Sequence, residues 1–373
     1  MSVPVVTTIS TANQKVLDYI ESTFNKIIQD IQGDPCKKAV IVLRRITSVR
    51  PYHDHEDYMR LKWHIEDSEV VYAFPGKNRD DAWRFACLAR ILSEIHSAVK
   101  QGIIVTKRDI FYHDPGLFKQ QTTVDRHVDD IAHTCGVTRR DLNIAASPKG
   151  LVAGLKTGNL TDQIVIIHDC YDLTTFDHLA NINWILVVEK EAIFSALLER
   201  RFHRHPIIGP GVLATAKGYP DLATRRFLRA LVDQCQSNVP VFGLFDNDPD
   251  GIGILKCYLY GSKRSAREQS CIAPEMTWIG LKSEDLMAIT GAGNSWLTLS
   301  MRDRNAATSM LNSGEWKDEE GQLLPGLRDC HAELQRMLWL NRKAEIQILD
   351  KLEGGLYAWL ARTLSVALAE VQT

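Results

Sequence analysis

Three aspartates lie within five residues in the stretch GLFDNDPDGIG, residues 243–253, directly after an apolar run. The carboxylates of Asp246, Asp248 and Asp250 repel one another at this spacing unless a cation balances them. A divalent metal site is one use for such a cluster. A solvated acidic turn at the end of a strand is the other, and for an isolated cluster it is the more common one.

Calcium binding is excluded by the residues around this cluster. The pattern Asp-x-Asp-x-Asp-Gly opens an EF-hand loop, which needs a glutamate at its twelfth position and a helix before it. The twelfth position here is Cys257, and the preceding VPVFGLF is typical of a strand. A magnesium site that handles phosphates stays open beside the solvated turn. It predicts another carboxylate at the end of a neighbouring strand, and Glu189, which ends the run WILVVE, is the candidate.

Tyr112, in the segment TKRDIFYHD, is a second residue that could do chemistry. Because it follows Ile110 and Phe111, a core or β-edge aromatic is the ordinary interpretation. The chemical interpretation is a nucleophile that attacks a phosphodiester and conserves its bond energy as a phosphotyrosyl ester. A phenol with a pKa of about 10 needs help to lose its proton. Arg108 could bind the phosphate or stabilise the phenolate.

The composition excludes some classes of protein. The 373 residues carry a formal net charge of −2, so the chain is not basic all over, although a local basic face would be enough to hold phosphates. No two of the eight cysteines form a Cys-x-x-Cys pair, which argues against structural zinc and suits a reducing compartment. The sequence has no secretory signal pattern and no apolar run that approaches a membrane span, so a soluble, intracellular protein without a membrane partner is expected.

The first half of the chain is mainly helical in pattern. Amphipathic helices are expected over 12–31 and from Asp80 to a stop at Gly102, with a strand at KKAVIVLRRI between them. The segments TTVDRHVDDIAHTCG and TRRDLNI resemble a helix-turn-helix, with Gly136 at the turn and Thr138 as the N-cap of the second helix.

The pattern changes after about residue 160. The short apolar runs QIVIIHD, NWILVVEKE and VPVFGLFDND each end in acidic residues, and helical segments such as 190–200 and 221–235 lie between them. Strands that alternate with helices predict an α/β sheet with a site along its carboxyl edge.

A strand that ends in Glu, followed by a strand that ends in Asp-x-Asp, is the signature of the Toprim fold of topoisomerases, primases and some nucleases. The chain resembles, more specifically, the A subunit of DNA topoisomerase VI, and more closely the meiotic relatives that make the double-strand breaks of recombination. The matching segments, within roughly residues 80–350, are TKRDIFYHD, SPKGLVAG, WILVVEKEAIFSAL, AKGYPDLATRRFL, FDNDPDGIGIL and LNRKAEIQIL.

The resemblance implies a multi-domain α/β protein with three parts. Residues 1–75 are an N-terminal extension with a helix and a strand, and their role is unknown. Residues 76–160 form a winged-helix (helix-turn-helix, CAP-like) domain that carries the tyrosine. Residues 161–373 form a Toprim metal-binding domain with helical elements at its C-terminal end.

The resemblance also assigns roles to the acidic cluster and the tyrosine. Tyr112 is the nucleophile, and Arg108 is the catalytic residue beside it. The metal ligands are Glu189, Asp246 and Asp248, which hold Mg²⁺ with Mn²⁺ as a substitute. For Asp250 two roles stay open, binding a second metal ion or only shaping the turn, because the family often has a non-acidic residue there while other Toprim enzymes use a third aspartate.

Basic residues near these segments could line a DNA channel: Lys149, Lys217 and Arg225. Solvated surface charge is the alternative for each of them. The turn AKGYPD departs from the usual GKGYPD of the family at Ala216, which bears on how closely a phosphate could approach the backbone there.

The function implied is that of a DNA transesterase that cuts duplex DNA through a 5′-phosphotyrosyl intermediate, as a homodimer in the nucleus, to initiate meiotic recombination. No P-loop is present, so no ATP site is expected in this chain. The expected partners are a topoisomerase VI B-like subunit and meiotic accessory proteins. The alternatives are a topoisomerase VI A subunit that reseals its breaks, a hydrolytic Toprim nuclease, and a catalytically silent DNA-binding subunit.

Overall fold

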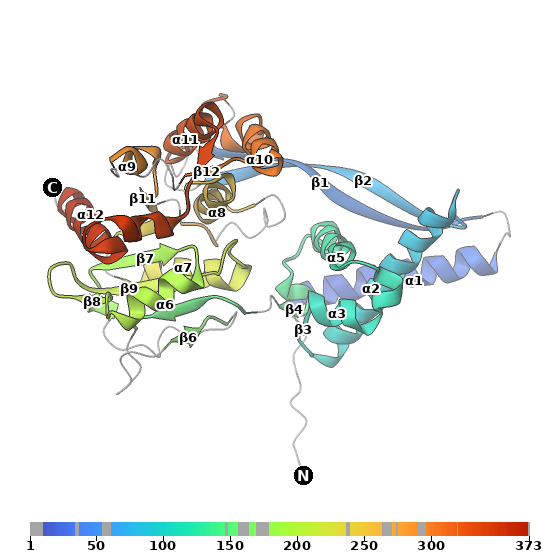
Figure 1. Ribbon diagram of the computed structural model, residues 1–373. Helices are drawn as coiled ribbons and strands as arrows, with labels where there is room; N and C mark the ends of the chain where they lie inside the picture. Colours follow the sequence, from blue (N-terminus) through green and yellow to red (C-terminus); the bar gives the residue numbers. More distant parts are fainter. Residues whose placement is uncertain are drawn as a thin grey trace, which may run out of the picture. The chain divides into compact units, whose positions relative to one another are not determined.

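Figure 1 presents the computed structural model of the chain, in which two compact units are distinguished. Unit 1 comprises residues 1–49, 63–147 and 263–268, and unit 2 comprises residues 50–62, 148–262 and 269–373. The structure describes residues 10–33, 37–53, 61–145, 148–155, 164–168, 179–235, 239–262, 271–273, 275–288, 296–318 and 320–371. The predicted boundary between residues 160 and 161 lies outside these ranges, as does Ser147 of the segment SPKGLVAG.

Two long helices of unit 1 follow the predicted pattern. Helix α1 spans Thr11–Gln32, and Ser10 caps its start with a side chain that accepts the Asn13 N–H. Helix α2 spans Arg79–Gln101, packs against α1, and ends at Gly102 in the left-handed conformation that glycine tolerates best. Both predicted helices are confirmed. The predicted inward face of α2 is buried as expected: Phe85, Leu88, Leu92, Ile95 and Val99.

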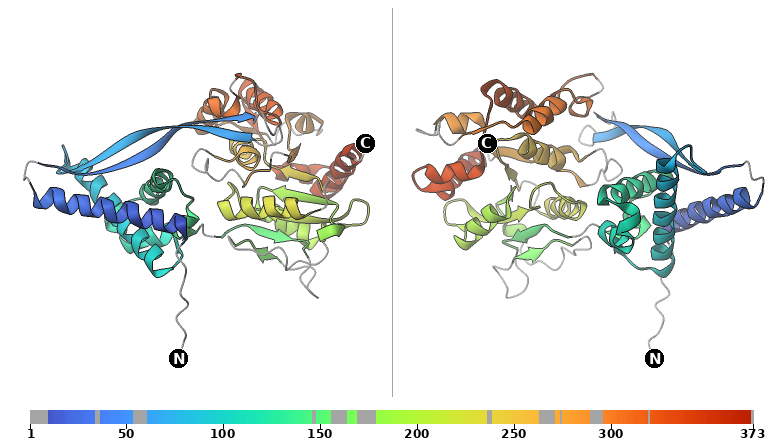
Figure 2. Two further views of the ribbon diagram at one scale, coloured as in Figure 1. Left: turned by 180° about the vertical axis from the view of Figure 1, so that it is seen from behind. Right: turned by 45° about the vertical axis from the view of Figure 1, so that its right-hand side comes forward.

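Two strands form a long, twisted ribbon, which is visible in Figures 1 and 2. Strand β1 spans Ala39–His53 and pairs with β2, which spans Leu61–Phe74. The predicted strand at KKAVIVLRRI is confirmed as the first part of β1, and β2 was not predicted.

The predicted helix-turn-helix is confirmed in its first helix and wrong in its second. Helices α3 (Lys107–His113), α4 (Pro115–Phe118) and α5 (Gln121–Cys135) follow β3 (Val105–Thr106), and Gly136 ends α5 in the left-handed conformation. After the turn there is only a 3₁₀ helix, η1 (Arg140–Leu142), and Thr138 does not cap it but binds the Asp141 carboxylate. The chain leaves the helical path because Asn143 is left-handed and β4 (Ile144–Ala145) pairs with β3.

Unit 2 contains the predicted α/β sheet. Its strand order is β11–β10–β7–β9–β5–β6, and β8 pairs with β9. The central pairs β10–β11, β7–β10 and β7–β9 are parallel, while β5 is antiparallel to its neighbours. The strands span Leu151–Ala153 (β5), Val165–Ile166 (β6), Trp184–Val188 (β7), Arg204–His205 (β8), Gly209–Thr215 (β9), Val241–Leu244 (β10) and Thr277–Gly280 (β11).

Helices connect and cover these strands, as Figure 1 shows. The segments predicted as helices over 190–200 and 221–235 are confirmed as α6 and α7. The helices span Glu191–Glu199 (α6), Leu222–Gln234 (α7), Pro249–Tyr260 (α8), Ser283–Ala288 (α9), Met301–Leu311 (α10), Leu327–Leu340 (α11) and Gly355–Val371 (α12). Short elements complete the unit: η3 (Leu179–Asn181), β12 (Leu297–Thr298), η7 (Gly314–Trp316), β13 (Arg342–Lys343) and η8 (Ile346–Lys351).

Strand β7 is buried on both faces, which explains its unbroken apolar sequence. Trp184, Leu186 and Val188 pack in one cluster with residues of α6 and α12. The alternate residues Ile185 and Val187 are equally buried and point to the opposite face. The first polar residue after this strand therefore emerges at the sheet edge, where Glu189 stands.

Candidate active site

Tyr112 lies on α3, a short helix that a capping box fixes at its first turn. The Thr106 hydroxyl accepts the Asp109 N–H at 3.1 Å, and the Asp109 carboxylate accepts the Thr106 N–H at 2.8 Å. Ile110 is buried and anchors the helix, whereas Tyr112 is 68% exposed. The interpretation of Tyr112 as a core or β-edge aromatic is therefore wrong, and its phenol is accessible from solvent.

Arg108 is exposed and stands four residues before Tyr112 on the same helix. Residues at this spacing share a helix face, so the two side chains leave α3 on the same side. The neighbouring Lys107 is directed the other way: its Nζ lies 2.7 Å from Asp129 Oδ1 on α5. This partly buried ion pair ties the start of α3 to α5 and keeps the tyrosine helix in place.

A cavity of about 510 Å³ adjoins the tyrosine, and Tyr112 forms part of its wall. The wall also contains His113, whose Nδ1 lies 2.9 Å from the Glu94 carboxylate, and the apolar side chains of Ile103 and Val105. The surroundings of the phenol within unit 1 thus contain both polar and apolar side chains.

The structure brings Glu189 and Asp246 together at the carboxyl edge of the sheet. Strands β7 and β10 are adjacent and parallel, with Val188 opposite Leu244, so the residues that follow both strands emerge side by side. The backbone N–H of Asp246 donates to Glu189 Oε2 at 2.9 Å. Two acids 57 positions apart in the chain are therefore direct neighbours.

The electrostatics of this edge favour a bound cation. Burial, and next the charge of Asp246, raise the pKa of Glu189 to about 8. Burial also raises the pKa of Asp246, against the lowering effect of Lys190, and it raises the pKa of Asp248. Burial disfavours the charged form of each of these carboxylates, and a divalent cation beside them would stabilise that form.

Asp248 and Asp250 occupy the start of α8. Asp248 is the N-cap, and its Oδ1 accepts the Gly251 N–H at 2.7 Å. Asp250, in the first turn, lies 3.0 Å from Arg302 Nη2 and accepts the Tyr219 hydroxyl at 3.4 Å. Asp248 is thus still a candidate member of the acidic edge, while the carboxylate of Asp250 already binds the Tyr219 hydroxyl and the Arg302 guanidinium.

The donor set suits a hard cation, because carboxylate oxygens are the ligands that Mg²⁺ prefers. Across the described ranges, however, no three His, Cys, Asp or Glu side chains are close enough together to hold a metal ion. One of the acids forms an ion pair with a lysine instead: Lys190 Nζ lies 2.8 Å from Asp246 Oδ2. In this structure, Lys190 provides the positive charge beside these carboxylates.

The three basic candidates have different surroundings. Lys149 Nζ donates to the carbonyl of Tyr219 at 2.6 Å and supports the GYPD turn. Lys217 has a positive φ and pairs with Glu191 at 3.0 Å. Arg225 is only 5% exposed, and its Nε and Nη1 atoms find no hydrogen-bond partner among the described residues. Solvated surface charge is therefore the wrong interpretation for Arg225.

The sequence did not single out Lys190 or the C-terminal segment that reaches the acidic edge. Lys190 Nζ also lies 3.1 Å from Glu345 Oε2, and the Ile346 N–H donates to Asp246 Oδ1 at 2.9 Å. Asn247 forms a bridge with Ala344. The motif LNRKAEIQIL was the available signal, since it contains these residues, but its place beside Asp246 depends on the folded chain.

Family models match both units. Residues 184–357 match the Toprim domain shared by Spo11 and the A subunit of topoisomerase 6, and residues 83–144 match type IIB DNA topoisomerase. Toprim domains generally bind a divalent metal. Within the described residues, no helix combines the length and apolar character needed to cross a bilayer.

Curated proteins are similar over most of the chain. The meiotic recombination protein rec12 of Schizosaccharomyces pombe is 33% identical, over 90% of this chain and 91% of that protein. The A subunit of DNA topoisomerase 6 from Arabidopsis thaliana is 33% identical over 70% of this chain, and the meiotic recombination protein SPO11 of Homo sapiens is 35% identical over 62%. The matches span 60% of each of these two longer relatives. The chain therefore belongs to the family of Spo11 and the topoisomerase VI A subunits, type IIB topoisomerase-like transesterases that cleave DNA.

Proposed function

We propose that this protein makes DNA double-strand breaks that initiate meiotic recombination, with Tyr112 as the nucleophile. The observation that carries the proposal is the exposed phenol on a capped helix, within a chain that is similar to rec12 over nine tenths of its length. The phenolate oxygen attacks a backbone phosphate and becomes linked to the 5′ end, and the 3′ hydroxyl is released. Arg108, on the same helix face, binds the phosphate and stabilises its growing negative charge.

The acidic edge of unit 2 holds Mg²⁺ in this proposal, and Mn²⁺ can replace it. Glu189, Asp246 and Asp248 would hold the ion, which would replace Lys190 as the cationic partner of Asp246. The ion would neutralise charge on the reacting phosphate and on the leaving 3′ oxygen. Asp250 takes a positioning role at the start of α8, because Arg302 and Tyr219 already engage it.

We assign to the chain an extension over 1–75, a CAP-like winged helix within 76–160 and a Toprim domain over 161–373, with β5 joining the sheet of the last part. The packing of α3 against α5 supports the helical part of a winged helix. Lys149 and Lys217 contact the phosphates of duplex DNA. Arg225 is buried on α7, so we assign it no direct contact with DNA.

The proposed assembly is a homodimer in the nucleus that works with a B-type subunit and meiotic accessory proteins. The name of the Arabidopsis thaliana relative, which is the A subunit of a topoisomerase, supports a partner subunit. The same name favours a second candidate function, in which the breaks are resealed. The two functions differ in whether 5′-linked DNA accumulates on the protein or only passes through it.

The test is to recover the protein under denaturing conditions from meiotic cells and to label the 3′ hydroxyls of DNA that stays attached. We expect labelled DNA on the wild type and none on Tyr112→Phe. Tyr52→Phe, which changes a partly exposed tyrosine of β1, is the matched control and should keep the label. Breaks without any adduct on the wild type would support a hydrolytic nuclease instead. An adduct that survives Tyr112→Phe would place the nucleophile elsewhere.

A further inference from the structure

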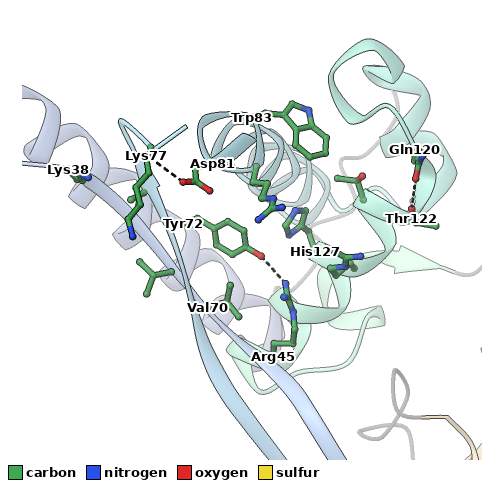
Figure 3. Close-up of a pocket in the computed structure, with 16 residues that line it drawn as sticks. Lys38, Arg45, Val70, Tyr72, Lys77, Asp81, Trp83, Gln120, Thr122 and His127 are labelled. Carbon is green, nitrogen blue, oxygen red and sulfur yellow. Dashed lines mark hydrogen bonds between the residues drawn. The ribbon is translucent and has the colours of Figure 1, made fainter. Parts of the chain in front are cut away.

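A second cavity in unit 1, of about 650 Å³, has no role in the chemistry proposed above. Figure 3 shows its walls, which come from the β1–β2 ribbon, the start of α2 and the start of α5. Its basic lining residues are Lys38, Arg45, Lys77, Arg84 and Arg126. Asp81 is the only carboxylate in its wall among the described residues, and that side chain accepts the Lys77 N–H at 3.2 Å.

Most of this positive charge is not neutralised. Arg45 is held by Asp130, at 2.7 and 2.9 Å, and by the Tyr72 hydroxyl at 2.9 Å, so its guanidinium is fixed in place. Arg84 and Arg126 are exposed and form no ion pair with any residue that the structure describes. The cavity is therefore lined by one arginine that its contacts hold in place and by two exposed arginines.

His127 supplies a polar atom that is left without a partner. It is 4% exposed, and its Nδ1 is buried with no hydrogen-bond partner in the described structure. Its ring packs edge-on against Tyr72, with centroids 5.5 Å apart, and Figure 3 shows both rings at the cavity. Burial, and then the charges of Arg45, Arg126 and Arg84, lower the pKa of His127 to about 4. The ring is thus neutral at pH 7, and a tautomer with a proton on Nδ1 can donate to a ligand.

The N-terminus of α5 adds further donors. This helix has 15 residues, its N-cap Gln120 makes no side-chain capping bond, and no acidic residue stands in its first turn. Thr122 and Thr123 of that turn line the cavity. The Thr123 N–H is bound to the Gln120 carbonyl at 3.1 Å, and the positive end of the helix dipole favours a negative charge at this place.

We propose that this cavity is a phosphate-binding site, in which Arg84 and Arg126 contact the phosphate oxygens and His127 Nδ1 donates to one of them. Arginine favours phosphate because its planar fork donates two parallel hydrogen bonds. The volume exceeds what one phosphate fills, so the cavity can also accept a phosphate that is part of a larger molecule. Its source is either the backbone of bound DNA or a small phosphorylated compound, and the chemistry of recognition is the same.

The test uses the full-length protein with Tyr112→Phe, so that a failure of the cleavage chemistry cannot affect the result. Arg84→Gln/Arg126→Gln removes two exposed charges and should leave the fold intact. Lys100→Gln, an exposed charge in the last turn of α2, is the control. One arm measures the affinity for labelled duplex DNA over a range of salt concentrations. The other measures stabilisation against heat by inorganic phosphate, pyrophosphate, ATP and polyglutamate in a phosphate-free buffer.

If DNA supplies the phosphate, the double variant binds DNA about 10-fold more weakly and with a salt dependence lower by about one to two phosphate contacts, while Lys100→Gln stays within about twofold. If a small compound supplies it, the phosphates stabilise the parent but not the double variant, and DNA affinity is unchanged. His127→Phe should reproduce either effect in part. Equal behaviour of the parent and the double variant in both arms would overturn the proposal. Stabilisation by polyglutamate but not by any phosphate would overturn it too, in favour of an acidic protein partner.

Discussion

At the residue scale, the stability of the charged carboxylates at the acidic edge of the sheet depends on which cation lies beside them. Lys190 Nζ lies 2.8 Å from Asp246, which is 3% exposed, and burial, and next the charge of Asp246, raise the pKa of Glu189 to about 8. A buried carboxylate that loses its partner is costly, because its charge is left without compensation. The Lys190 ammonium group and a divalent ion should therefore be able to replace one another as the cation that compensates the charge of Asp246.

This substitution predicts how Lys190→Met behaves. Without divalent metal, we expect the free energy of unfolding to fall by about 2 kcal/mol, because Asp246 loses its ion pair. Addition of Mg²⁺ should stabilise the variant more than the wild type, as measured by thermal unfolding with and without a chelator. Lys256→Met, which breaks the ion pair with Glu315, is the control and should gain nothing extra from Mg²⁺. Equal responses of both variants to Mg²⁺ would contradict a metal site at this edge.

His127 predicts a pH dependence of stability in unit 1. Its pKa is about 4 in the folded protein, below its ordinary value of 6.5, so the unfolded chain binds more protons between these two values. The stabilisation is complete above about pH 6.5 and is lost as the pH falls towards 4. Urea unfolding in phosphate-free buffer should show a decrease across this window that is steeper in the wild type than in His127→Phe, by about 3 kcal/mol in total. Parallel pH profiles of the two proteins would show that the imidazole titrates normally.

At the scale of elements, α3 is too short to be stable by itself and depends on its capping box and on α5. Thr106→Ala removes the hydroxyl that accepts the Asp109 N–H, and the free energy of unfolding should fall by about 1 kcal/mol. The yield of DNA adduct should fall as well, because the first turn no longer holds Tyr112 in position. Ser22→Ala, which removes an exposed hydroxyl of α1, is the control and should change stability by less than about 0.5 kcal/mol. An unchanged stability of Thr106→Ala would show that α5 alone holds the helix.

The elements also show what the sequence could predict. The helix α2 could be predicted from its apolar periodicity, and the alternation of β7, α6, α7 and β10 from the order of apolar runs and helical segments, because each of these patterns lies within a short stretch of sequence. The contact between Glu189 and Asp246 was predictable from a general property of parallel sheets, whose strands end at the same edge. What failed depended on distant partners. The turn after Gly136 becomes a 3₁₀ helix because β4 pairs with β3, and the Ile346 N–H reaches Asp246 from 100 positions away.

At the scale of the whole molecule, the tyrosine and the acidic edge belong to different units of the chain. In the proposed homodimer, the Tyr112 of one subunit works with the metal site of its partner. Co-expression of Tyr112→Phe and Glu189→Gln subunits distinguishes this arrangement from one within a single chain. A shared site leaves one half-site intact, so the mixed dimer should nick one strand and carry DNA only on the Glu189→Gln subunit. A site within one chain would leave both half-sites inactive, and neither nicks nor adducts would form.

The central claim is that Tyr112 is the nucleophile, and its most direct test is to identify the residue to which the DNA is covalently joined. The protein would be recovered from meiotic cells under denaturing conditions, its DNA trimmed with nuclease, and the remaining nucleotide located by mass spectrometry of the peptides. We predict a nucleotide joined through its 5′ phosphate to Tyr112, in the peptide that contains DIFYHD. A nucleotide on another residue, or DNA breaks that form while Tyr112 stays unmodified, would contradict the assignment of Tyr112 as the nucleophile.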